Sequence, residues 1–200
     1  MNGIRFIAPI VEGHGEVQAI PILLRRLASE LAPQVDLQLN PALRVKVASF
    51  LDESGSGYFE KYIELAARKA KPWPKSCVLI LLDCEDLCPA ELGSKILNRA
   101  VSCRSDLTFL VILAHREYET WFLAAAESLR GGGGLAADLN PPTNCESIRN
   151  AKGWLSERMA SSYNEPDHQP KMTAAFNFDQ AKRAKSFNRG FEKLRAFLCG

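Results

Sequence analysis

The chain contains short continuous apolar runs that alternate with amphipathic stretches. A short apolar run between turn residues is typical of a strand that is covered on both faces, and apolar residues spaced three or four apart indicate a helix. Pro9 lies inside the first run although it cannot donate to a strand ladder. The predicted strands are Ile4–Val11, the weaker Arg44–Ser49, Cys77–Leu82 and Leu107–Leu113, and the helices predicted to follow them are Glu16–Leu31, Tyr58–Ala70, Ala90–Ala100 and Tyr118–Leu129.

Four successive strand-then-helix units predict an α/β fold with a mostly parallel sheet flanked by helices. The glycine run 131–134 and Asn140-Pro141-Pro142 then interrupt the pattern. Beyond them we expect only helices, which need a surface to cover their apolar faces. We therefore expect an α/β core over residues 1–130 and a helical extension of the same domain over 131–200. The helices predicted in this extension are Glu146–Met159, Met172–Ala184 and Ser186–Leu198.

Length and composition indicate a globular, cytoplasmic protein without a membrane partner. The chain has 200 residues, of which 46% are hydrophobic. Apolar runs such as Leu107–Ala114 are far shorter than the roughly 20 residues that span a bilayer. The first residues show no signal-peptide pattern. We expect the six cysteines to be reduced thiols, because a chain of this size does not need disulfides.

Acidic residues follow three of the predicted strands. Glu12 follows the first, Asp83-Cys84-Glu85-Asp86 follows the third, and His115-Arg116-Glu117-Tyr118-Glu119 follows the fourth. Ligands of open parallel sheets bind beyond the carboxyl ends of the strands. Carboxylates that meet at one edge repel one another unless a cation or shared protons compensate. Oxygen ligands without clustered histidines favour Mg²⁺ or Mn²⁺, although aspartate and glutamate are also common in turns and helix caps.

The segment "GHGEVQ", residues 13–18, matches only part of a dinucleotide-binding fingerprint, because Gln18 replaces the third glycine. We expect its glycines to let the backbone turn sharply and to leave Glu12 exposed above the sheet. Glu16 is either a metal ligand or a carboxylate that compensates the helix dipole. We interpret His14 as an ordinary loop residue.

The ordered motifs resemble the Toprim domain of topoisomerases, bacterial primases and nucleases of the overcoming-lysogenization-defect type. "VEGHGE" at 11–16 and "VLILLDCED" at 78–86 are similar to the two Toprim motifs. More narrowly, the chain resembles small stand-alone Toprim-like bacterial proteins of uncharacterised function. The stretches that carry this second resemblance are "REYETW" at 116–121 and "SFNRGFEKL" at 186–194, so that the likeness extends over almost the whole chain.

The resemblance implies roles for particular residues. The metal-binding glutamate of Toprim domains corresponds to Glu12, and their aspartate pair corresponds to Asp83 and Glu85. Toprim enzymes usually have aspartate where Glu85 stands, which is a departure from the pattern. Asp86 is a candidate additional ligand, and Glu119 matches the glutamate of the narrower group's "ExW" stretch.

The function implied is metal-assisted hydrolysis of a nucleic-acid phosphodiester. Glu12 is a candidate metal ligand or general base, and Arg116 or Lys171 is a candidate for stabilising transition-state charge. Alternatively, Arg116 is a surface residue that pairs with a nearby glutamate, and Lys171 is an ordinary solvated residue. The basic segment after Lys171 could contact a nucleic-acid backbone or could be a solvated helix face. By resemblance we also expect a separate ATPase partner and a role in mobile-element or phage defence.

Two other functions remain open at this level. The acidic edge could belong to a non-catalytic protein-binding module, in which case the carboxylates would point apart. It could also belong to a small-molecule phosphohydrolase, for which a narrow pocket is expected. Cys84 and Cys88 are spaced loosely like a zinc pair but lack a second pair. We interpret Trp121 as a core residue rather than a stacking platform.

Overall fold

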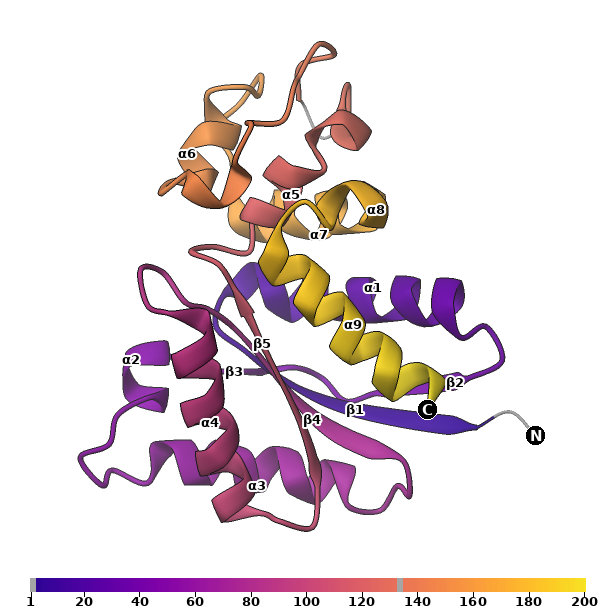
Figure 1. Ribbon diagram of the computed structural model, residues 1–200, viewed down its shortest axis with the longest axis vertical. Coiled ribbons are helices and arrows are strands. Elements are labelled where there is room, and N and C mark those ends of the chain that lie inside the picture. The colour runs from indigo at the N-terminus through magenta and orange to yellow at the C-terminus, as the bar shows by residue number, and fades with distance from the viewer. Residues whose placement is uncertain (1–2, 133–134) are drawn as a thin grey trace.

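The computed structural model describes residues 3–132 and 135–200, and within them it contains a five-stranded parallel sheet (Figure 1). The strand order is β2-β1-β4-β5, and β3 pairs with the second half of β1. The predicted α/β class with a parallel sheet flanked by helices is therefore confirmed. The strands are β1 (Ile4–Val11), β2 (Asp36–Leu39), β3 (Leu43–Arg44), β4 (Ser76–Asp83) and β5 (Thr108–Ala114).

The register of the three longest strands brings their carboxyl ends to one edge of the sheet. Val11 of β1 lies opposite Leu81 of β4, and Asp83 of β4 lies opposite Ala114 of β5. Because these strands are parallel, the segments that follow them emerge side by side. This arrangement positions the candidate site.

Pro9 lies in the interior of β1 at a place where its missing N–H costs no ladder bond. Phe6 donates its amide to Lys75 on the β4 side, whereas Ile7 and Val11 accept bonds from the β2–β3 side. Pro9 lies two residues from both Ile7 and Val11, so its backbone nitrogen also faces the side of β2 and β3. At that point β2 has ended at Leu39 and β3 has not yet begun at Leu43.

Helices cover both faces of the sheet (Figure 1). Alternate residues of a strand point to opposite faces, so that Ile7 and Leu79 pack in one hydrophobic cluster and Ile10 and Ile80 in the other. The first cluster includes side chains of α1 and α9, and the second includes side chains of α3 and α4. These four helices are α1 (His14–Leu31), α3 (Tyr58–Ala70), α4 (Pro89–Cys103) and α9 (Lys185–Cys199).

The region between α1 and α3 differs from the prediction. The expected strand Arg44–Ser49 is wrong, because only Leu43–Arg44 forms β3 and Val47–Phe50 forms the short helix α2. The sequence pattern also missed β2. Its residues alternate between exposed and half-buried at the sheet edge, so that it lacks the continuous apolar run of a central strand.

The second half of the chain is helical but more broken than expected. The predicted helices Tyr118–Leu129, Glu146–Met159 and Met172–Ala184 each contain shorter elements. A proline or an asparagine cap marks several of these breaks; Asn177, for example, accepts a bond from the amide of Gln180 at the start of α8. The elements are α5 (Thr120–Ala124), η1 (Ala126–Leu129), η2 (Cys145–Ser147), α6 (Ala151–Ser156), α7 (Glu165–Ala175) and α8 (Phe178–Ala181).

The C-terminal helices share the hydrophobic core of the α/β part. Phe176, Phe187 and Leu194 belong to the same buried cluster as Ile7 and Leu24. Helices α5 to α8 gather beyond one end of the sheet, and α9 runs back across it (Figure 1). All six cysteines are free thiols. Among the described residues, no helix has both the length and the apolar character needed to cross a bilayer.

Candidate functional site

A pocket of about 360 Å³ lies at the carboxyl edge of the sheet. It contains residues that directly follow β1, β4 and β5, together with residues of α6 and α7. Among the described lining residues, seven are acidic and three are basic, so the pocket carries an excess of negative charge if all are ionised. The lining residues are Glu12, Gly13, Glu16, Asp83, Glu85, Asp86, Arg116, Glu117, Arg149, Lys152 and Glu165.

Asp83 and Glu12 lie at the base of this pocket. Asp83 is the last residue of β4, and its Oδ1 atom is enclosed without a hydrogen-bond partner. Burial, followed by the charges of Glu119 and Glu16, raises the pKa of Asp83 well above its ordinary value. Burial, followed by the charges of Glu16 and Glu85, also raises the pKa of Glu12. Added positive charge in the pocket would therefore stabilise the ionised forms of these two carboxylates.

Glu85 and Arg116 connect the ends of β4 and β5 through strained backbone. Both residues have positive φ, 47° for Glu85 and 65° for Arg116, which is uncommon outside glycine. The Glu85 amide donates to the Arg116 carbonyl at 3.1 Å. Two such residues side by side in a pocket fit the tendency of backbone strain to occur at functional sites. Glu85 is exposed at the pocket.

Asp86 is occupied by two arginines. One of its carboxylate oxygens pairs with Arg116, and the other accepts a bond from Arg149 at 2.8 Å. Arg116 also donates to the carbonyl of Glu146 at 3.2 Å. Asp86 therefore holds two guanidinium groups at the pocket rim, which makes it a less available metal ligand than Asp83.

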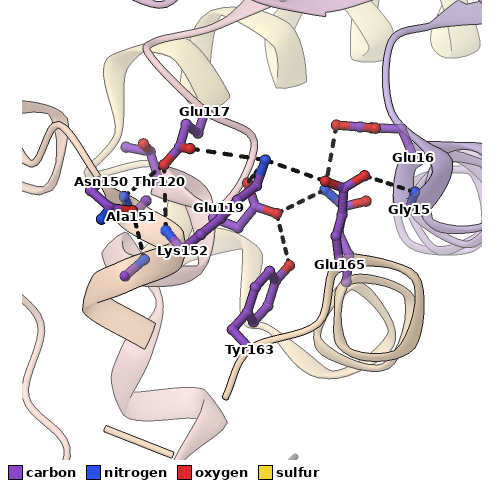
Figure 2. Close-up of polar contacts among 12 residues, drawn as sticks. Gly15, Glu16, Glu117, Glu119, Thr120, Asn150, Ala151, Lys152, Tyr163 and Glu165 are labelled. Carbon is purple, nitrogen blue, oxygen red and sulfur yellow. Dashed lines mark hydrogen bonds and ion pairs between the residues drawn. The ribbon is translucent and has the colours of Figure 1, made fainter. Parts of the chain in front are cut away.

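Lys152, at the start of α6, extends into the middle of the carboxylates (Figure 2). Its Nζ atom lies 3.3 Å from an oxygen of Glu165, 3.8 Å from Glu119 and 3.9 Å from Glu117. Burial lowers the pKa of Lys152, but the charges of Glu119, Glu165 and Asp83 outweigh burial and raise it overall. Lys152 is therefore an ammonium ion among the carboxylates at neutral pH.

A buried polar network lies behind Lys152. Glu119 is completely buried, and its Oε1 accepts bonds from Tyr163 at 2.8 Å and Gln169 at 3.2 Å. Gln169 also donates to Glu16 at 3.4 Å. Burial is the main reason that the pKa of Glu119 rises to about 7. One oxygen each of Glu16, Glu119 and Gln169 is buried without a hydrogen-bond partner.

The chain bends at Glu12 and Gly13 as expected, although Glu12 is half-buried rather than exposed and the backbone angles there do not require glycine. Gly13 has ordinary extended backbone angles, φ −88° and ψ 166°, and Gly15 has no positive φ. Instead, a Cβ on Gly13 would lie 2.1 Å from a Glu16 oxygen, and one on Gly15 would lie 2.1 Å from a Gln169 oxygen. Both glycines let polar side chains pack directly against the start of α1. Gly15 also donates its amide to Glu165 at 3.0 Å.

Glu119, a predicted metal ligand, is buried behind the pocket lining, and two other residues considered from the sequence also lie outside that lining. Lys171 is exposed on α7, beyond Glu165, and His14 is exposed at the start of α1. Trp121 is a core residue, as interpreted from the sequence, and its indole N–H donates to the buried Ser186 hydroxyl at 3.1 Å. Trp121 and Ser186 thus bring the "REYETW" and "SFNRGFEKL" stretches together in the fold.

Several site residues were not among those predicted from the sequence. Glu117 was noted only as part of an acidic strand end, and the missed residues are Arg149, Lys152, Tyr163, Glu165 and Gln169. Glu117 accepts the amide of Ala151 at 2.6 Å and so fixes the start of α6. Most of the missed residues come from α6, α7 and the segments beside them, far along the chain from the strand ends. Asn164, which caps α7, and Pro166 in its first turn are local signals that could have placed Glu165 in a first helical turn.

The chemistry of the donor set fits a hard divalent cation, although the carboxylates are not yet arranged as ligands. Oxygen donors of the kind that Mg²⁺ and Mn²⁺ prefer line the pocket, and Asp83 and Glu16 each present an unpartnered buried oxygen. Within residues 3–132 and 135–200, however, no group of three or more His, Cys, Asp or Glu side chains is placed to hold a metal ion. In this arrangement the ammonium group of Lys152 supplies positive charge to the pocket carboxylates.

Comparison with known proteins identifies the family but no activity. Neither the curated proteins nor the solved structures contain a match to the chain. A family model described as "Domain of unknown function (DUF4276)" matches residues 11–195. Because this match covers nearly the whole chain, the protein belongs to that family of unknown function.

Proposed function

We propose that the pocket binds Mg²⁺ or Mn²⁺ and hydrolyses a phosphodiester of nucleic acid, as a Toprim-type nuclease does. The observation that carries this proposal is the position of Asp83. Its buried, unpartnered oxygen lies at the end of a central strand, in the same pocket as Glu12 and Glu85. A buried carboxylate without a partner is costly unless a proton or a cation completes its environment.

Glu12, Asp83 and Glu85 would hold the cation, and Glu16 is a further candidate. Such a cation polarises a phosphate, stabilises the leaving oxygen and lowers the pKa of a bound water. As an alternative to binding the cation, Glu12 would act as general base for a water at the pocket, because its raised pKa in the metal-free protein makes it a better proton acceptor than an ordinary glutamate.

Arg116 and Arg149 would orient the phosphate. Asp86 holds both guanidinium groups at the rim, and such planar donors suit phosphate oxygens. In this proposal Asp86 positions the two arginines and does not bind the metal. Lys171 is exposed on α7 outside the pocket lining, and this proposal assigns it no role.

The alternatives differ in their support. The non-catalytic binding module is disfavoured, because Glu12, Asp83 and Glu85 line one pocket. A small-molecule phosphohydrolase is the second candidate, because a volume of about 360 Å³ falls within the range of small-ligand sites. Partnership with a separate ATPase in mobile-element or phage defence extends the proposal through the resemblance to Toprim nucleases alone.

The test is cleavage by the purified protein with Mg²⁺, Mn²⁺ or a chelator. Substrates should include single- and double-stranded DNA and RNA and a small chromogenic phosphodiester, and each should be assayed with and without the product of a neighbouring gene. Asp83→Asn keeps the side-chain volume but removes the anionic ligand, so we expect almost complete loss of cleavage with the fold intact. Asp36→Asn, at the opposite end of the sheet on β2, is the matched control. Equal cleavage by the two variants would refute the role of Asp83, and cleavage of the small substrate alone would favour the second candidate.

A further inference from the structure

Lys152 occupies the position where the acidic pocket needs a positive charge. Its Nζ atom lies within 4 Å of three separate carboxylates, those of Glu117, Glu119 and Glu165. Asp83 also contributes to its electrostatic environment. This ammonium group therefore has three carboxylate partners, which come from two segments far apart in the chain.

The backbone around Lys152 is fixed in a way that directs its side chain inward. Asn150 caps α6 by accepting the amide of Gly153 at 2.7 Å. Glu117 accepts the amide of Ala151 at 2.6 Å and lies near the amide of Lys152 itself. These bonds close the first turn of α6 against the end of β5. The Lys152 side chain is left 37% exposed, so it has an open route back to solvent.

The environment of Glu16 indicates that Lys152 does not fully compensate the negative charge of the pocket. Glu16 is 3% exposed and lines the pocket, yet its Oε2 atom has no hydrogen-bond partner. The other two basic lining residues, Arg116 and Arg149, are engaged by Asp86. The inner carboxylates therefore share one lysine charge, and they could accommodate a cation of higher charge.

We propose that Lys152 is a built-in counter-ion that keeps the carboxylates together in the metal-free protein and must leave when a divalent cation binds. This inference rests on the proposed metal site and describes how that site is regulated. Mg²⁺ binds oxygens at roughly 2.1 Å, so the carboxylates must close around it more tightly than around an ammonium group. Two cations in one small pocket repel each other, and the side chain with a route to solvent is the one that moves.

Metal affinity in a set of lysine variants provides the first test. Lys152→Met removes the charge but keeps most of the aliphatic stem, Lys152→Arg keeps the charge, and Lys171→Met is the control on exposed α7. Titrations with Mg²⁺ and Mn²⁺, followed by calorimetry and by thermal unfolding, report binding without any assay of cleavage. We expect Lys152→Met to bind at least about tenfold more tightly than wild type, because removal of a neighbouring unit charge strengthens cation binding. Lys152→Arg and Lys171→Met should resemble wild type.

A second test uses only wild-type protein, in case Lys152→Met does not fold without metal. Labelling with an amine reagent, quantified by mass spectrometry, should increase at Lys152 relative to Lys171 when Mg²⁺ or Mn²⁺ is added. Labelling that stays constant or decreases would overturn the displacement.

The outcomes separate this inference from the proposed function. If wild type binds metal and Lys152→Met binds it equally or more weakly, the counter-ion role is refuted while the metal site stands. If neither protein binds metal, both the metal site and the competition are refuted. If only Lys152→Met binds metal, the lysine is the barrier to binding, and the inference is supported.

Discussion

Replacing Glu119 by glutamine should change the stability of the protein in a pH-dependent manner. Glu119 is completely buried beside Asp83 and Glu16, and burial is the main cause of its raised pKa. Glutamine keeps the shape of the side chain and an oxygen that can accept the bonds from Tyr163 and Gln169. The substitution therefore removes a buried charge while leaving most of the packing unchanged.

The size of the change in unfolding free energy follows from the difference between the ordinary glutamate pKa of 4.5 and the value of about 7 for Glu119 in the folded protein. A carboxyl group whose pKa is raised by folding contributes its full stability at pH values below the unfolded pKa, and this contribution is lost as pH rises from 4.5 through 7. At about 1.4 kcal/mol per pKa unit, ionised Glu119 costs wild type about 1 kcal/mol at pH 5 and about 3 kcal/mol at pH 8. Glu119→Gln should therefore be more stable than wild type by about these amounts.

Urea unfolding of both proteins at the two pH values tests the prediction. For a chain of this size, about 3 kcal/mol corresponds to an increase in Tm of about 6–12 °C at the higher pH. Glu91→Gln, at an exposed position of α4, should stay within about 0.5 kcal/mol of wild type at both pH values. Destabilisation of Glu119→Gln at pH 8, or a stability difference that is the same at both pH values, would refute the reasoning.

Two further predictions concern packing around the site, and both are measured by chemical denaturation. Gly15→Ala places a methyl group 2.1 Å from a Gln169 oxygen and should destabilise by about 1–3 kcal/mol. Gly93→Ala, whose new Cβ would lie at an ordinary 3.7 Å from its nearest neighbour, should stabilise α4 by up to about 1 kcal/mol. Equal effects of the two glycine substitutions would contradict the close-approach explanation. Ser186→Ala leaves the buried indole N–H of Trp121 without an acceptor and should cost about 1–3 kcal/mol, and an unchanged unfolding midpoint would show that this bond is dispensable.

The candidate site combines residues of two kinds, and only one kind was predictable. Glu12, Asp83 and Glu85 follow strands, and the ends of neighbouring parallel strands must lie at one edge of a sheet. Lys152 and Glu165 belong to short helices whose sequences give no indication of their neighbours. Their positions depend on how α6 and α7 pack against the strand ends.

The sequence by itself determined the α/β class, the central strands and the chain order of the acidic strand ends. These features are local, because a continuous apolar run such as Cys77–Leu82 indicates a buried strand wherever its neighbours lie. The edge strand β2 escaped detection because its pairing with β1, rather than its own hydrophobicity, makes it a strand.

Only the tertiary structure decided the electrostatics of the pocket. The raised pKa of Glu119 requires complete burial, and the position of Lys152 requires Glu117 and Glu119 to meet the distant Glu165 around one ammonium group. Likewise, the glycines at 13 and 15 are explained by side chains of Glu16, Glu165 and Gln169 that approach the backbone in space. Coulombic and steric effects depend on distance in three dimensions, and separation along the chain does not encode that distance.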